Sequence, residues 1–261
     1  MIKIVKKGDC PYFEPSCGGC ETDKINCRCP KLIAYEGVND PKTKKEVLEE
    51  LNVTSTTKFG TMLQMQSVFA KRFHPIENLS KSEIDKWTNE YLVCIEDEII
   101  EAGEFLKIYN IKKYDEKEYR KELIDIVHFL MDGMCVAGIT EQDFINIINC
   151  NDVDLLNYMV DKSRLSIRSL INMVDGNFDL ARLYSLNYML RDIRLIRQCI
   201  SWKHWKKPND TIDKEKITLA WYNMFSHLID AFVLAGMSAD DIYNIYVNKN
   251  IENILRQKAG Y

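Results

Sequence analysis

Long apolar runs and a strong charge of either sign are both missing from this 261-residue chain. No stretch approaches the roughly 18 uninterrupted apolar residues of a transmembrane helix, so we expect no membrane partner. The start, MIKIVKKGDC, has basic residues but no apolar core behind them, so we expect no secretory signal and a cytoplasmic location. A net charge of -4 also gives no reason to expect a nucleic-acid partner.

Proline is scarce after residue 41: only Pro75 and Pro208 follow. Apolar residues then recur at intervals of three and four, as in Leu123, Ile126 and Leu130, and no strand-like alternation is found. The pattern predicts an all-α helical bundle over residues 46–261, preceded by a small, cysteine-rich N-terminal extension over residues 1–45.

The helical body contains an internal repeat. FLMDGMCVAGIT (129–140) aligns without a gap with HLIDAFVLAGMS (227–238), and FINI (144–147) continues the match to IYNI (242–245) at the same offset of 98 residues. This self-similarity predicts a duplicated helical unit.

The nine cysteines fall into two groups. Four occur singly in apolar helical patterns and are expected to be reduced core residues: Cys94, Cys135, Cys150 and Cys199. Five are crowded into the N-terminal extension: Cys10, Cys17, Cys20, Cys27 and Cys29. In a reducing compartment these five are candidate ligands of a structural Zn²⁺ ion, with an iron–sulfur cluster or free thiols as alternatives.

Two pairs of acids occupy successive helical patterns. Glu101 and Glu104 form an E-x-x-E pair, and Glu122 and Asp125 form an E-x-x-D pair inside the otherwise apolar run LIDIVHFLM. Glu98 lies one turn before Glu101, next to Asp97, so the membership of the first pair stays open. Residues three apart lie on one helix face, so each pair brings two carboxylates together. A solvated helix face is the simpler interpretation of one such pair, but acids within an apolar run need a counter-charge. Clustered oxygen ligands without His or Cys favour Mg²⁺ or Mn²⁺.

A di-iron helical bundle would also place carboxylates on facing helices. That chemistry uses Glu-x-x-His on two of them, and this sequence has no second candidate beside His128, which follows Asp125 by three residues. A lone helical histidine is more often a hydrogen-bonded core residue or a neighbour of the metal ligands, so we expect a supporting role for His128.

The last helical segment carries a polar stripe of cationic and amide side chains. Its members follow one another at intervals of three or four, or directly: Tyr246, Lys249, Asn250, Asn253, Arg256 and Gln257. Such donors could bind phosphate oxygens, or the stripe could simply face solvent at the end of the chain.

Taken together, these motifs resemble the all-α nucleoside triphosphate pyrophosphohydrolases, and among them the dimeric dUTPases and their dCTP-hydrolysing relatives. The family's metal signature, E-x-x-E followed by E-x-x-D, is matched at residues 101–125. Its closing motif, Y-x-x-K-N-x-x-N-x-x-R-Q-x-x-G-Y, is reproduced from Tyr246 to Tyr261. Met65 and Gln66 resemble the M-Q of the family's first helix. The family's W-K-x-W-K element, however, occurs in the second repeat, at residues 202–206.

The resemblance implies Mg²⁺-dependent hydrolysis of a deoxynucleoside triphosphate, dUTP foremost, to the monophosphate and pyrophosphate by a homodimer. It assigns Glu101, Glu104, Glu122 and Asp125 to the metal, with Glu104 as the candidate general base. Substrate binding falls to the M-Q glutamine and to members of the closing motif: Gln66, Tyr246, Lys249, Asn250, Asn253, Arg256 and Tyr261. The same chemistry on dCTP or a purine nucleotide is one alternative. A non-catalytic protein that binds nucleotide or nucleic acid through the cysteine-rich extension is the other.

Overall fold

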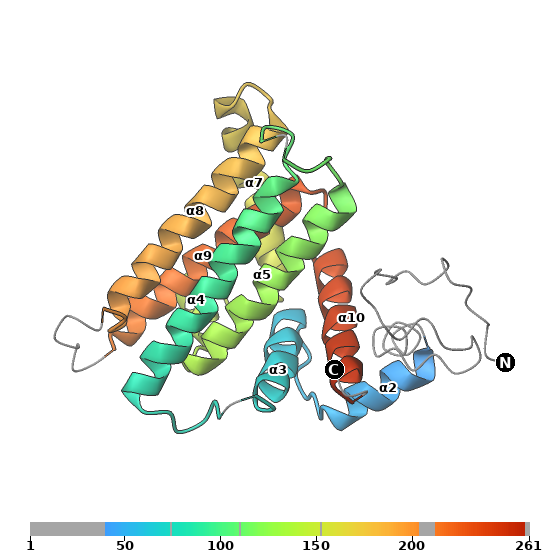
Figure 1. Ribbon diagram of the computed structural model, residues 1–261, viewed down its shortest axis with the longest axis vertical. Coiled ribbons are helices and arrows are strands. Elements are labelled where there is room, and N and C mark those ends of the chain that lie inside the picture. Colours follow the sequence, from blue (N-terminus) through green and yellow to red (C-terminus); the bar gives the residue numbers. More distant parts are fainter. Residues whose placement is uncertain (1–39, 74, 110, 152, 204–211, 259–261) are drawn as a thin grey trace. The chain divides into compact units, whose positions relative to one another are not determined.

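The computed structural model describes residues 40–73, 75–109, 111–151, 153–203 and 212–258. Within these residues the secondary structure is helical, without strands, which confirms the predicted all-α class (Figure 1). The helices are α2 (Pro41–Glu50), α3 (Lys58–Ala70), α4 (Lys81–Glu104), α5 (Glu116–Val136), α6 (Glu141–Ile148), α7 (Leu155–Met173), α8 (Phe178–Cys199), α9 (Lys214–Leu234) and α10 (Ala239–Lys258). The five N-terminal cysteines lie outside the described residues, so their metal-binding role stays a prediction.

The chain forms two compact units. The larger covers residues 54–246, and the smaller combines the chain up to residue 53 with residues 247 onward. In the smaller unit α2 begins at Pro41, where Asp40 accepts hydrogen bonds from the first free backbone amides, and its last residue, Glu50, pairs with Lys258. The helix therefore starts inside the predicted N-terminal extension, with the last proline of that extension as its first residue.

The duplication is visible in the order and packing of the helices in the larger unit. In the first copy α3 and α4 pack against α5; in the second, α7 and α8 pack against α9. The two copies meet where α4 contacts α8 and α5 contacts α9. Helices α4, α5, α8 and α9 therefore lie side by side (Figure 1). Helix α9 is long and apolar enough to cross a membrane, but 67% of its most apolar window is buried in this bundle.

A close contact between α5 and α9 fixes their separation. Trp221 of α9 is fully buried, and its ring lies against the backbone of Gly133 on α5. A Cβ atom at position 133 would lie 2.8 Å from Cζ2 of that ring, inside the van der Waals distance. The helices can approach this closely only because residue 133 has no side chain.

The four isolated cysteines differ in how deeply they are buried. Cys199 is buried, as predicted for a core residue, whereas Cys94, Cys135 and Cys150 are half-buried. Burial raises the pKa of the Cys135 thiol to about 12, with smaller opposing effects of Asp132, which raises it, and Lys71, which lowers it. That thiol stays protonated at neutral pH and packs as a small apolar group.

Candidate active site

The carboxylate-bearing face of α4 follows from how the helix is capped and packed. Ser80 and Glu83 form a reciprocal capping box that sets where α4 begins. The residues that then turn into the core are Leu92, Ile95, Ile99 and Ala102. Glu98 and Glu101 lie three residues apart beside this apolar stripe, at the edge that α4 shares with α5.

Three carboxylates from these two helices converge. One oxygen from each of Glu98, Glu101 and Glu122 lies within 4.8 Å of the other two. Glu98 and Glu122 are half-buried, while Glu101 is exposed, so the cluster is open to solvent on one side. Three convergent anionic oxygens with an open side fit a hard divalent cation such as Mg²⁺ or Mn²⁺, which keeps part of its water shell when bound. The three glutamates are therefore a candidate metal site, and the identity of the metal stays a prediction.

This cluster overlaps the predicted metal ligands without coinciding with them. Glu101 and Glu122 were predicted and are brought together. Glu104, the last residue of α4, instead forms an ion pair in which Oε2 lies 2.6 Å from Nζ of Lys112, and Asp125 lies half-buried one turn beyond Glu122 on α5. Glu98 was not in the predicted set, although the spacing E-x-x-E also joins it to Glu101. That spacing is the sequence signal that left the membership of the first pair open.

A buried polar network lies further along α5. Gln66 of α3 is 1% exposed; its Nε2 donates to Asp132 at 2.9 Å, and its Oε1 accepts from the Tyr246 hydroxyl at 2.8 Å. Nδ1 of His128 lies 3.0 Å from the same Oε1, so the amide orientation makes that nitrogen a donor. The His128 ring also stacks on Tyr246 with centroids 4.4 Å apart. His128 is thus a buried, hydrogen-bonded neighbour of Gln66, and its supporting role for the metal ligands stays a prediction.

Gln66 and Tyr246, both predicted to bind substrate, are hydrogen-bonded to each other although 180 residues separate them in sequence. Tyr246 is fully buried, and its hydroxyl oxygen also lies 3.0 Å from the carbonyl oxygen of Met62, so the two acceptors share one hydroxyl hydrogen. The M-Q pair of the first helix and the start of the closing motif therefore form one buried contact in the larger unit.

Burial raises the pKa of Asp132 to about 7, and the hydrogen bond from Gln66 opposes that shift. Asp132 follows Glu122 and Asp125 at helical spacing, so these three acids form one stripe along α5. The stripe runs from the open carboxylate cluster into the interior network.

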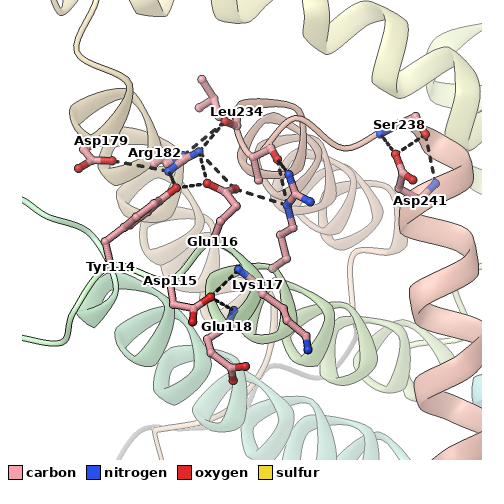
Figure 2. Close-up of polar contacts among 12 residues, drawn as sticks. Tyr114, Asp115, Glu116, Lys117, Glu118, Asp179, Arg182, Leu234, Ser238 and Asp241 are labelled. Atoms are coloured by element: carbon pink, nitrogen blue, oxygen red, sulfur yellow. Dashed lines mark hydrogen bonds and ion pairs between the residues drawn. The ribbon is translucent and has the colours of Figure 1, made fainter.

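The loop between α4 and α5 is anchored by a buried arginine (Figure 2). The Arg182 side chain is 9% exposed; Nη1 donates to the Tyr114 hydroxyl at 2.6 Å, and Nη2 donates to Glu116 at 3.0 Å. The same guanidinium donates to the carbonyl oxygen of Leu234 at the end of α9, at 3.0 Å. Arg120 similarly donates to the carbonyl oxygen of Ala235. Arg182 thus holds the end of the α4–α5 loop against α8 and α9 of the second repeat.

The closing motif lies mainly on α10. Asn250 is buried, Lys249 and Asn253 are half-buried, and Arg256 is half-buried and paired with Glu252. Tyr261, also predicted to bind substrate, lies outside the described residues. The phosphate-binding role of these residues stays a prediction.

The second repeat lacks the acids of the first but keeps an interior polar cluster. Ala220 and Asn223 stand where Glu122 and Asp125 would be, and Asp230 stands where Asp132 would be. Asp230 accepts a hydrogen bond from Ser163 at 2.6 Å, and burial raises its pKa. Among the described residues, this copy therefore keeps a buried, hydrogen-bonded aspartate but has no acid at positions 220 and 223.

An all-helical bundle with a duplicated unit, and with carboxylates of two adjacent helices converging at an open edge, defines the class of all-α nucleoside triphosphate pyrophosphohydrolases. Within that class the chain belongs to the dUTPase family, whose model matches residues 58–261.

A curated relative is similar to part of the chain. It is a dCTP pyrophosphatase of Enterobacteria phage LZ5, 32% identical over 71 residues, which cover 23% of this chain and 41% of the relative. The chain thus matches less than half the length of that protein. No solved structure gives a significant match.

Proposed function

We propose that this protein hydrolyses a deoxynucleoside triphosphate, with dUTP as the preferred substrate, to the monophosphate and pyrophosphate in the presence of Mg²⁺ or Mn²⁺. The observation that supports this most strongly is the convergence of Glu98, Glu101 and Glu122 at the open edge between α4 and α5. Membership of the dUTPase family supplies the reaction class.

The three clustered glutamates would hold the cation, with Asp125 one turn further along α5 as an additional ligand. A divalent cation bound there would offset negative charge on the phosphate oxygens and lower the pKa of a water bound to it. Glu104 is the candidate base, because a carboxylate beside the cluster can accept the proton of an attacking water. In the structure its carboxylate is paired with Lys112, so Glu104 must release this partner before it can act.

Substrate binding is assigned in two parts. The closing motif on α10 supplies Lys249, Asn250, Asn253 and Arg256 as donors to phosphate oxygens, with Tyr261 beyond the described residues. The hydrogen-bonded pair of Gln66 and Tyr246 would shape the nucleoside pocket from within the bundle.

The same chemistry on dCTP is the second candidate, and the similarity to a phage dCTP pyrophosphatase favours it. A purine nucleotide would be a further variant of the same reaction. A non-catalytic nucleotide- or nucleic-acid-binding protein would need the cysteine-rich extension to provide its function. We also propose a homodimer, as the resemblance implies.

A panel of deoxynucleoside triphosphates, incubated with the full-length protein and Mg²⁺, tests the proposal. We expect pyrophosphate release from dUTP and none when a chelator replaces the cation. Release from dCTP alone would reassign the substrate, and no release from any nucleotide would support the non-catalytic alternative.

A further inference from the structure

Lys112 occupies a distinctive position beside the carboxylate cluster. Its ammonium lies 2.6 Å from Oε2 of Glu104 and 4.9 Å from the ring centroid of Phe105. Its backbone amide donates to the carbonyl oxygen of Glu104 at 3.1 Å, so both ends of the residue contact the end of α4. The side chain remains 43% exposed, which leaves room for the ammonium to move.

The charges of the clustered acids also act on the Lys112 ammonium. The hydrogen bond that the ammonium donates to Glu104 raises the pKa of Lys112 most, and desolvation lowers it. The charges of Glu104, Glu101 and Glu122 raise it further. Two of these acids belong to the convergent cluster. A cation bound there and the Lys112 ammonium would therefore repel each other.

The rest of the loop holds Lys112 in place without restraining its side chain. Tyr114 and Glu116, just beyond it, are fixed by Arg182, as Figure 2 shows. The ammonium of Lys107 lies 4.7 Å from the Tyr114 ring centroid, which folds the start of the loop onto its end. Lys112 thus sits on a positioned backbone with a flexible four-carbon stem.

We propose that Lys112 is a phosphate-binding residue that Glu104 holds beside the carboxylate cluster until substrate arrives. When a cation enters the cluster with a nucleoside triphosphate, the ammonium leaves Glu104 and pairs with a phosphate oxygen. Glu104 is then released to act beside the cation. The transfer exchanges one charge-assisted hydrogen bond for another and forms no covalent bond. This inference rests on the proposed function and adds a residue that the closing motif does not contain.

The proposal predicts effects of opposite sign on cation and nucleotide affinity. Lys112→Met removes the charge and keeps the length of the stem. It should therefore tighten Mn²⁺ binding in the absence of nucleotide about two- to fivefold, the range expected for loss of one partly exposed competing charge. Binding of the non-hydrolysable analogues α,β-imido-dUTP and α,β-imido-dCTP with Mg²⁺ should weaken about tenfold, as for one lost charge-assisted contact.

The experiment uses full-length protein, with free Mn²⁺ measured by electron paramagnetic resonance and analogue binding measured by calorimetry. Lys113→Met is the matched control, because Lys113 is the adjacent exposed lysine of the same loop; neither affinity should change. Lys112→Arg, which keeps a cation, should retain most of the nucleotide affinity.

Unchanged or weaker Mn²⁺ binding in Lys112→Met would show that the ammonium does not compete with the cation, and would overturn the first half of the proposal. Unchanged analogue binding would overturn the phosphate-binding role. Lys112 would then only connect the loop to the end of α4. If the wild-type protein binds neither analogue, the proposed function and the phosphate-binding role fail together. The Mn²⁺ measurement would still decide the competition at the cluster.

Discussion

At the scale of single residues, the site depends on where each carboxyl group is placed relative to solvent. Glu101 is exposed beside its half-buried neighbours Glu98 and Glu122, an arrangement that suits cation binding. Asp132, on the same face of α5, is 6% exposed and bonded to Gln66. One stripe of acids along a single helix therefore contains groups with different chemistry, because burial changes along it.

Replacement of Asp132 by Asn tests this difference through the pH dependence of stability. In the unfolded chain Asp132 titrates near pH 4, whereas burial raises its native pKa to about 7. The native state therefore binds the extra proton in this window. Below about pH 4 the contribution of Asp132 to the free energy of unfolding is complete. It decreases as the pH rises and is lost above about pH 7, with a slope of at most about 1.4 kcal/mol per pH unit.

Urea unfolding of the wild type and Asp132→Asn at several pH values between about 4 and 8 measures this contribution. We expect the wild type to lose stability relative to the variant as pH rises. Parallel curves for the two proteins would indicate that folding does not raise the pKa of this carboxyl group.

At the scale of helices, the packing of the first repeat against the second depends on how closely α5 and α9 approach each other. Gly133→Ala places a methyl group against the ring of Trp221, which is fully buried. We expect a loss of about 1–3 kcal/mol in the free energy of unfolding, the usual cost of overpacking. Thermal and urea unfolding measure it.

Gly103→Ala on α4 is the matched control. A Cβ at that position would lie 3.8 Å from the Tyr109 ring, an ordinary contact. This variant should be neutral or slightly stabilised, because Ala favours a helix over Gly by about 1 kcal/mol. Equal losses in both variants would show that helix interiors here reject a methyl group for reasons unrelated to Trp221.

Much of the helical architecture could be predicted from the sequence, but the membership of the site could not. Three- and four-residue spacing identifies helices and their duplication, since both are local patterns. The choice between Glu98 and Glu104 depends on which turn of α4 faces α5, and three glutamates at the same spacing satisfy the pattern equally. The contact between Gln66 and Tyr246 spans 180 residues, and no local pattern contains it.

At the scale of the whole larger unit, Arg182 connects the two repeats. It joins the start of α5, through Glu116, to the end of α9, through Leu234. Its guanidinium also lies 5.3 Å from the ring centroid of the buried Tyr119. The loop that carries Lys112 is thus held by a residue of the second repeat, in which Ala220 and Asn223 replace the acids of the first.

Arg182→Met should destabilise the protein by about 2–4 kcal/mol, because it leaves Glu116 and the Leu234 carbonyl oxygen without their buried donor. Arg164→Met removes an exposed ion pair with Asp161 on α7 and should cost less than about 1 kcal/mol. Unfolding midpoints of both variants compare them. A loss in Arg182→Met no larger than in Arg164→Met would mean that the connection between the repeats contributes little.

The central claim is that carboxylates of α4 and α5 bind the cation that hydrolysis requires. The most direct measurement is Mn²⁺ affinity and deoxynucleotide turnover of Glu122→Gln beside Glu118→Gln, one turn earlier on α5, where Glu118 pairs with Lys121. We predict that Glu122→Gln loses about tenfold or more in affinity and about 100-fold or more in turnover, while Glu118→Gln matches the wild type. Wild-type Mn²⁺ binding and full turnover in Glu122→Gln would contradict the account.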